Sequence, residues 1–207
     1  MARPIKVVRD INDSKDLWKI VVRSKHMWTV ASSSNKEHLE LILLDSKLDM
    51  IQVTVPLHLY SKYLVELIVG SSYIIQNFKV SNKNFSFKST NHGFKLVFCG
   101  STSVKKAELP NIPVNYVNIL SLSSIADGRF QSNLLFNVVG GVIEIVPTQI
   151  MADNNKSKVV FMITDMSKTL VQYTIWDQLA LEFYQYYKSH NEEENVVLLQ
   201  NARIKGA

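Results

Sequence analysis

A long internal repeat constrains this chain more than any other feature of its sequence. The segment HLELILLDSKLDMIQVTVPLHLYSKYLVEL (38–67) aligns without a gap on KVVFMITDMSKTLVQYTIWDQLALEFYQYY (158–187). The identical pairs, all separated by the same 120 residues, include Asp45 and Asp165, Gln52 and Gln172, and Thr54 and Thr174. Further on, IIQNFKV (74–80) matches LLQNARI (198–204). Solenoid periods are shorter, so the repeat predicts two copies of one small domain.

The alternation of residues 169–176 predicts a strand with two different faces. One face carries Leu170, Gln172, Thr174 and Trp176, and the other, which we expect to be buried, carries Val171, Tyr173 and Ile175. A large ring at the end of a polar face is unusual unless something stacks on it. On the pattern alone, Trp176 is equally well explained as a core tryptophan at a strand–helix junction.

The order of elements in the first copy predicts a small barrel. We expect strands at 17–30, 38–44 and 50–55, a helix opened by Pro56, and two further strands within 71–80 and 84–98. A small all-β unit with one inserted helix is typical of a five-stranded barrel. We therefore divide the chain into a first domain (1–103), a linker containing Pro110 and Pro113 (104–133), and a second domain (134–207).

The second domain begins with a strand that contains Gly140 and Gly141, a pair typical of a bend or bulge. Its last strand is expected at 196–205, and the fifth strand that the repeat predicts does not follow. The second barrel is therefore expected to be truncated after its fourth strand: either the sequence is part of a longer protein, or the barrel is open on one side.

Composition argues against several classes of protein. The single cysteine, Cys99, excludes a disulfide framework or a cysteine-rich zinc site within the chain. No run approaches the ~20 apolar residues that span a bilayer, and the N-terminus lacks the apolar segment of a secretory signal. No phosphate-binding glycine loop, HExxH or GxSxG motif is present, and the histidines have no metal-ligand spacing. We therefore expect no catalysis, no cofactor, no metal and no membrane partner.

Basic residues provide the candidate binding positions. The formal net charge of +5 is compatible with a polyanionic partner without demanding one. Lys79 and Arg203 occupy the same Gln-Asn-x-basic position in the two copies, although a basic residue on a strand face is usually just solvated. A second candidate is the basic and aromatic cluster at the end of the first strand, made of Arg23, Lys25, His26 and Trp28; alternatively, this cluster is a solvated loop entry with Trp28 closing the barrel.

Five motifs in order resemble the tandem DNA-binding domains of the large subunit of replication protein A, most of all its plant form. They are VVRSKHMWTV, ELILLDSKLDMIQVTV, SNKNFSFKSTNHGFKLVF, FMITDMSKTLVQYTIWDQLALEF and LLQNARIK. The resemblance implies an all-β chain of two tandem OB-fold barrels, each with one helix between strands 3 and 4. It also implies binding of single-stranded DNA in replication, repair and recombination, and a location in the nucleus.

The resemblance assigns roles by position. It implies that Trp176 and Phe85 stack on bases and that Arg203 binds the DNA strand. Phe87 shares one face of its β-strand with Phe85, and of the two we expect Phe87 to lie in the core. The full set of expected nucleic-acid-binding residues is Arg23, Lys25, His26, Trp28, Lys79, Lys83, Phe85, Lys88, Lys156, Lys158, Trp176, Arg203 and Lys205.

The sequence also departs from this family. The segment Val55–Pro56 stands where the first domain of the family often has a second aromatic residue. The family's N-terminal recruitment domain and its C-terminal zinc-containing trimerisation domain are missing, which argues against heterotrimer assembly. Two alternatives therefore stay open: a repurposed OB-fold that binds proteins, and an RNA-binding protein that uses the same stacking chemistry.

Overall fold

The computed structural model describes residues 3–15, 17–31, 37–83, 88–146, 157–190 and 194–205. The chain divides into two compact units, Met1–Tyr116 and Val117–Ala207. The segment 104–133, expected as a linker, contributes most of one strand to the first unit and a short helix to the second. Among the described helices, none has the length and hydrophobicity required to traverse a lipid bilayer.

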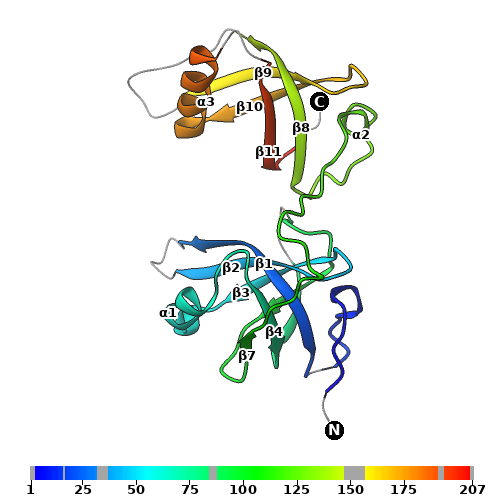
Figure 1. Ribbon diagram of the computed structural model, residues 1–207, viewed down its shortest axis with the longest axis vertical. Helices are drawn as coiled ribbons and strands as arrows, with labels where there is room; N and C mark the ends of the chain where they lie inside the picture. Colours follow the sequence, from blue (N-terminus) through cyan, green and yellow to red (C-terminus); the bar gives the residue numbers. More distant parts are fainter. Residues whose placement is uncertain are drawn as a thin grey trace. The chain divides into compact units, whose positions relative to one another are not determined.

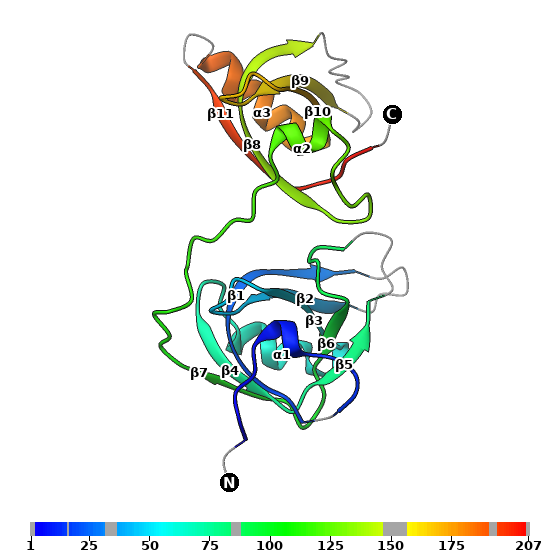
Figure 2. The ribbon, with the colours of Figure 1, turned by 90° about the vertical axis from the view of Figure 1, so that its right-hand side faces the viewer.

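The first unit is a barrel built from a curled sheet (Figures 1 and 2). Its elements are η1 (Val8–Asp10), β1 (Lys19–Val30), β2 (His38–Leu44), β3 (Met50–Val55), α1 (Leu57–Glu66), β4 (Ser72–Gln76), β5 (Lys79–Asn82), β6 (Phe94–Val97) and β7 (Ser103–Lys106). The sheet order is β5-β6-β3-β2-β1-β4-β7, with β6 parallel to β3. Because β4 and β5 follow each other directly in the chain, the sheet closes on itself through this divided strand.

The division between β4 and β5 has a local cause. Asn77 adopts a left-handed backbone conformation (φ 62°), which asparagine tolerates better than most residues. Its N–H donates to Trp18 O (3.1 Å), and its side-chain oxygen accepts from Arg3 Nη1 (2.6 Å). The equivalent Asn201 in the second unit is also left-handed (φ 55°). The Gln-Asn pair of the repeat therefore marks the break between β4 and β5 in the first unit, and in the second unit it lies at a register shift between Leu199 and Ala202 within one continuous strand.

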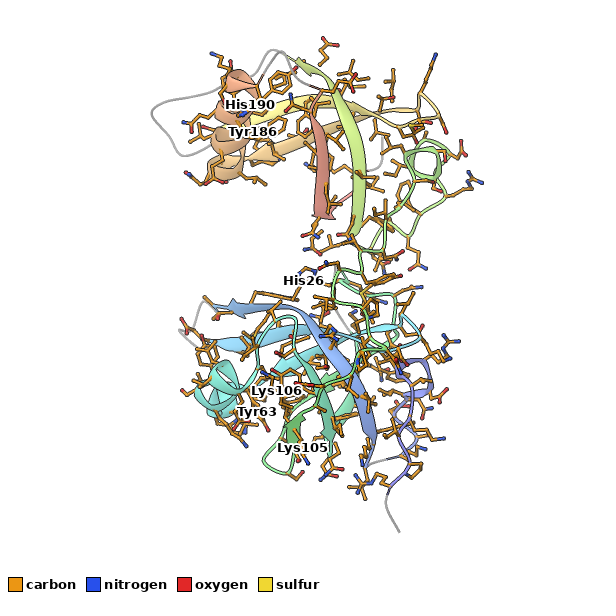
Figure 3. The ribbon with its side chains drawn as sticks, in the orientation of Figure 1. His26, Tyr63, Lys105, Lys106, Tyr186 and His190 are labelled. Atoms are coloured by element: carbon orange, nitrogen blue, oxygen red, sulfur yellow. The ribbon has the colours of Figure 1, made fainter. Side chains whose placement is uncertain are left out.

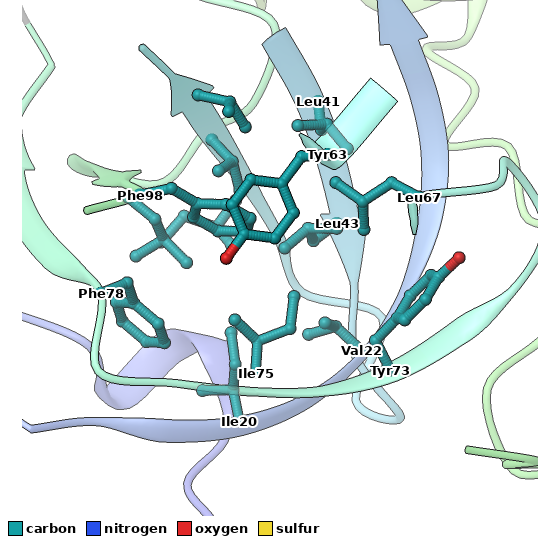
Figure 4. Close-up of a cluster of buried hydrophobic side chains, with 14 of the residues drawn as sticks. Ile20, Val22, Leu41, Leu43, Tyr63, Leu67, Tyr73, Ile75, Phe78 and Phe98 are labelled. Atoms are coloured by element: carbon teal, nitrogen blue, oxygen red, sulfur yellow. The ribbon is translucent and has the colours of Figure 1, made fainter. Parts of the chain in front are cut away.

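The core of the first unit lies inside the barrel, beneath α1. Trp18, just before β1, and Ile20 and Val22 of β1 point inward, as their alternation predicts, and are 0–3% exposed. Tyr63 of α1 meets Phe98 edge-to-face, with ring centroids 4.9 Å apart (Figure 4). Such pairs stabilise a core by about 0.5–1.5 kcal/mol beyond their buried area. The helix therefore closes one end of the barrel through this aromatic contact.

The second unit repeats the order of three strands, a helix and a further strand, and its described residues form four strands where those of the first unit form seven. It consists of α2 (Leu122–Ala126), β8 (Phe136–Val146), β9 (Lys158–Thr164), β10 (Leu170–Trp176), α3 (Asp177–Ser189) and β11 (Val196–Ala202). Its sheet has the order β10-β9-β8-β11, with all neighbours antiparallel. The expected fold class is thus confirmed: an all-β chain of tandem OB-fold units, the second with four strands and each with a helix after its third strand.

The repeat is visible in atomic detail at the turn before the third strand. Asp45 Oδ1 accepts hydrogen bonds from the N–H groups of Lys47 and Asp49 (2.8 and 3.0 Å). In the second unit, Asp165 Oδ1 accepts in the same way from Ser167 and Thr169 (3.0 and 3.1 Å). Aspartate favours such turns because its short carboxylate reaches the N–H groups just ahead. The two turns are therefore the same structure.

Of the two neighbouring glycines in β8, only Gly140 lies in close contact with the adjacent strand. A Cβ on Gly140 would lie 2.9 Å from Thr164 O and 3.1 Å from the Cβ of Ile163, on the neighbouring strand β9. A Cβ on Gly141 would meet nothing within 4 Å. The register of β8 against β9 shifts just beyond, between Val142 and Glu144. Gly140 therefore permits close strand contact beside the expected irregularity.

We expect Gly140→Ala to destabilise the second unit by about 1–3 kcal/mol, because the added methyl group forces the two strands apart. Gly141→Ala is the matched control and should change stability little. Chemical denaturation followed by Trp176 fluorescence measures both effects. Equal effects of the two substitutions would contradict the role given to Gly140.

Candidate nucleic-acid interface

The outer side of the first barrel carries two cross-strand rows. The strand register places Trp28, Glu40, Thr54, Val97 and Lys79 in one row, and His26, Ile42, Gln52, Lys95 and Ser81 in the next. We call these ten residues the first face; the label of His26 in Figure 3 marks its position on β1. Three expected residues, His26, Trp28 and Lys79, therefore share one surface although they come from strands far apart in the sequence.

A buried carboxylate organises the middle of the first face. Glu40 is 3% exposed and accepts from Gln52 Nε2 (3.0 Å) and Thr54 Oγ1 (2.8 Å). Lys95 Nζ in turn donates to Thr54 Oγ1 (3.2 Å), and His38 Nε2 lies 3.2 Å from Glu40. These contacts hold neighbouring polar side chains in fixed positions.

One acceptor of this network is unused. Gln52 Oε1 is buried and has no hydrogen-bond partner among the described residues. An unsatisfied buried acceptor is unfavourable by about 1–3 kcal/mol. Gln52 therefore carries an unmet hydrogen-bonding requirement beneath the first face.

Lys83 is more enclosed than its loop position predicts. It is 5% exposed, and its Nζ donates to the carbonyl oxygen and the hydroxyl of Thr90 (2.8 and 2.7 Å). Burial, followed by the positive charge of Lys88, lowers the pKa of Lys83 to about 8, while Glu40 opposes the shift. Lys95 also lowers this pKa, so several lysines lie near one carboxylate and leave the area positively charged.

The end of β1 contributes a neutral ring. Burial, and then the charge of Lys25, lowers the pKa of His26, so this imidazole is neutral at pH 7. Lys25 lies beside it and donates from Nζ to Val114 O (2.6 Å). His26 therefore presents a flat uncharged surface next to Trp28, which is also partly exposed.

The structure contradicts the expected role of Arg23. Its side chain is buried, with Nε donating to Ile112 O (2.8 Å) and Nη2 to Leu109 O (3.0 Å). Nη1 donates to the carbonyl oxygen of Gly70. The guanidinium therefore fixes the segment that follows β7 to the barrel wall, and it is not available to a ligand.

The outer side of the second unit carries an exposed tryptophan. Trp176 is 48% exposed, whereas its neighbour Ile175 is 6% exposed and points into the core. Lys158, its cross-strand partner, places Nζ 5.2 Å from the Trp176 ring centroid. Gln172 and Thr174 continue the same side along β10, as expected. We call Lys158, Gln172, Thr174 and Trp176 the second face.

The backbone around Trp176 is fixed on its C-terminal side. Asp177 has a left-handed conformation (φ 54°) and donates its N–H to Ser157 O (2.7 Å). Helix α3 begins at this residue. The ring is thus held at a strand–helix junction, with its exposure determined by the alternation of β10.

The remaining expected residues fall into two groups. Phe85 and Lys156 lie outside the described residues. Lys79, Arg203 and Lys205 are exposed, and Lys88 is partly exposed.

Sequence reasoning missed Lys95 and Gln52 as parts of the first face. Gln52 was marked by the repeat, but Lys95 joins it only through the parallel pairing of β6 with β3. A parallel pairing between distant segments has no signal in local sequence patterns.

Comparisons with known proteins support this architecture. A sequence family described as "Domain of unknown function DUF223" matches residues 9–128. No curated protein matches the chain. A structure of a Replication Protein A heterotrimer bound to ssDNA aligns with 96% of this chain at 14% identity and a TM-score of 0.56. The chain spans 47% of the length of that structure's chain, and the likeness shows the tandem fold alone.

Two further solved structures each align with about half of the chain. One is DNA binding domain A of Replication Protein A from S. cerevisiae, with 18% identity, a TM-score of 0.41, and coverage of 52% of this chain and 96% of that one. The other is Pot1pC from Schizosaccharomyces pombe bound to ssDNA, with 11% identity, a TM-score of 0.40, and coverage of 53% and 91%.

We expect Arg23→Ala to destabilise the first unit by roughly 2 kcal/mol or more, because three backbone carbonyl oxygens lose a charged donor. Lys105→Ala, which removes an exposed cation of β7, is the control and should leave stability unchanged. Unfolding followed by the buried Trp18 reports on this unit. Unchanged stability in Arg23→Ala would contradict the assignment.

Lys83 should make the stability of the first unit depend on pH. Between about pH 8 and the ordinary value of 10.5, the unfolded chain holds a proton on Lys83 that the folded chain has lost. The free energy of unfolding should therefore rise with pH across this window, by at most about 1.4 kcal/mol per pH unit. Lys83→Met should remove that part of the rise. Equal pH dependence of the two proteins would show that Lys83 titrates normally.

Proposed function

The chain belongs to the DUF223 domain family, and from this premise we propose that it binds single-stranded DNA on the first and second faces. The observation that carries the proposal is the exposed ring of Trp176 with the ammonium of Lys158 beside it. Unpaired bases have apolar faces, and stacking one on an aromatic side chain contributes about 1–3 kcal/mol. A cation next to the ring is placed to neutralise a phosphate of the same strand.

The first face supports the proposal with a different combination of groups. It combines partly exposed Trp28 and neutral His26 with the cations of Lys79 and Lys95. The cations bind the backbone of any sequence and therefore give no base preference.

Two connected units strengthen binding without new contacts. Once one unit holds a strand, the other meets the neighbouring nucleotides at a high effective concentration. Each unit can therefore bind weakly while the whole chain binds tightly. This benefit requires only a flexible DNA strand and does not depend on a fixed arrangement of the units.

The cellular role follows from the resemblance noted in the sequence. We propose that the protein acts, like the plant form of the replication protein A large subunit, in replication, repair and recombination in the nucleus, as a binding protein without catalysis. The five ordered motifs and the tandem OB-fold support this role. RNA is the competing ligand, because a strand of RNA presents the same stacking surfaces.

We expect the chain to bind oligo-dT in preference to duplex DNA, with an affinity that falls as salt is added. The logarithm of the association constant should fall with the logarithm of salt by about 0.7 for each phosphate contact. Trp176→Ala should weaken binding by about 5- to 150-fold, the equivalent of one lost stack. Fluorescence anisotropy of labelled oligonucleotides at two salt concentrations measures these changes.

Tyr186→Ala is the matched control for this experiment. Tyr186 is 56% exposed but lies on α3, where it stacks on His190 with ring centroids 4.2 Å apart (Figure 3). Its loss should leave the affinity unchanged. Equal affinity for duplex DNA, or equal effects of the two aromatic substitutions, would contradict the proposal, and tighter binding of oligo-U would favour RNA.

A further inference from the structure

The register of the second sheet places a carboxylate on the same side as Trp176. Glu144 of β8 pairs with Met162 of β9, which pairs in turn with Gln172 of β10. Met162 is partly exposed and follows the buried Phe161, so the three paired side chains lie on the outer side of the sheet. We call Glu144, Met162 and Gln172 the Met162 row. Trp176 lies two cross-strand pairs further along β10.

The first unit has a neutral ring where the second unit has this carboxylate. His26 in β1 and Glu144 in β8 each follow a register shift in their strand. Their cross-strand partners, Ile42 and Met162, are separated by the 120 residues of the repeat and are therefore equivalent. The same sheet thus forms with either side chain at this position, so folding does not account for a carboxylate there.

A second difference between the units exposes the amide of Gln172. In the first unit, Gln52 is 5% exposed and its amide donates to the buried carboxylate of Glu40. Val160 stands in place of Glu40 in the second unit and offers no side-chain acceptor, and Gln172 is exposed. Among the described residues, no hydrogen bond or ion pair engages the side chain of Glu144 or Gln172. Both side chains are therefore available to a ligand.

A carboxylate on a nucleic-acid interface selects for hydrogen-bond donors. Glu144 repels phosphates, so a strand that crosses the Met162 row must turn a base towards it. Guanine has two neighbouring donors, N1–H and the N2 amino group, which match the two oxygens of a carboxylate. Adenine and cytosine have one amino group each, and thymine has one imino group. Guanine is therefore the base that satisfies Glu144 best.

The other two side chains of the Met162 row suit the same base. Neighbouring strands lie about 4.8 Å apart, so about 10 Å separates the backbones at Glu144 and Gln172, and one flat base fits between the two side chains. Met162 lies beneath this position, and its polarisable thioether packs favourably on aromatic rings. The amide of Gln172 can donate to O6 or N7 of guanine at the opposite edge of the base.

We propose that the Met162 row is a base-selective site with a preference for guanine. This inference rests on the proposed function and adds a ligand preference to the second unit. Trp176 stacks on a nearby base of any kind, because every base has an aromatic face. The chain therefore binds single strands in general and guanine-containing strands most tightly.

The test compares three oligonucleotides of equal length bound to the full chain. They are oligo-dT, a repeat of alternating dT and dG, and the same repeat with deoxyinosine in place of dG. Inosine differs from guanine only by lacking the N2 amino group, so the phosphate charge is unchanged. We expect the guanine repeat to bind at least about fivefold more tightly than the inosine repeat. Gln172→Ala should weaken both repeats equally, because both bases have O6 and N7.

Glu144→Gln tests the carboxylate without disturbing the core, because Glu144 is exposed. It should bring the affinities for the guanine and inosine repeats to within about twofold of each other, and it should tighten binding of oligo-dT, because a charge that repels phosphate is removed. Glu182→Gln, which removes an exposed carboxylate of α3, is the control and should preserve the preference.

The outcomes distinguish this inference from the proposed function. Equal binding of the guanine and inosine repeats by the unmodified chain overturns the guanine preference and leaves single-strand binding intact. An undiminished preference in Glu144→Gln, or an equal loss in Glu182→Gln, also overturns the role of Glu144. Failure of all three oligonucleotides to bind overturns both proposals.

Discussion

Closure of the first barrel by β6 is the interaction on which the rest of this unit depends. β6 pairs with β3 and β5, so the sheet leaves no free edge at this point. The pairing buries Leu96 and Phe98, and because side chains alternate along a strand, it necessarily turns Lys95 outward beside Gln52. The register of β6 therefore determines both which side chains are buried in the core and which lie on the first face. A shift by one residue would exchange them.

The same alternation explains why the second unit has a tryptophan side chain that is exposed to solvent. Ile175 and Trp176 are neighbours on one strand, and burial of the first requires exposure of the second. The ring could turn inward only if β10 changed register, which would expose Val171 and Tyr173 fully. The exposed ring of Trp176, beside a cation, does not contribute to the core. We therefore interpret it as a contact for a ligand.

The sequence predicted those parts of the structure that depend on local pattern. The strands of the first unit, the helix after the third strand and the two sides of β10 all follow from spacing within about ten residues. Arg23 was assigned wrongly because the register of β1 shifts between Ser24 and His26 and because its acceptors, Leu109 and Ile112, come from a distant segment. The enclosure of Lys83 was not predicted because it depends on hydrogen bonds to Thr90, and a spacing of seven residues does not reveal such a contact.

The most direct test of the account is to observe which tryptophan meets the DNA. An isotope-labelled chain titrated with oligo-dT gives separate indole N–H signals for its three tryptophans, Trp18, Trp28 and Trp176. Trp18 is 3% exposed and its indole N–H donates to Lys15 O (3.0 Å), so its signal should not move. The signal of Trp176 should shift progressively and saturate with the DNA. No shift at Trp176 under conditions where the DNA binds would contradict the account, because the bases would then lie elsewhere.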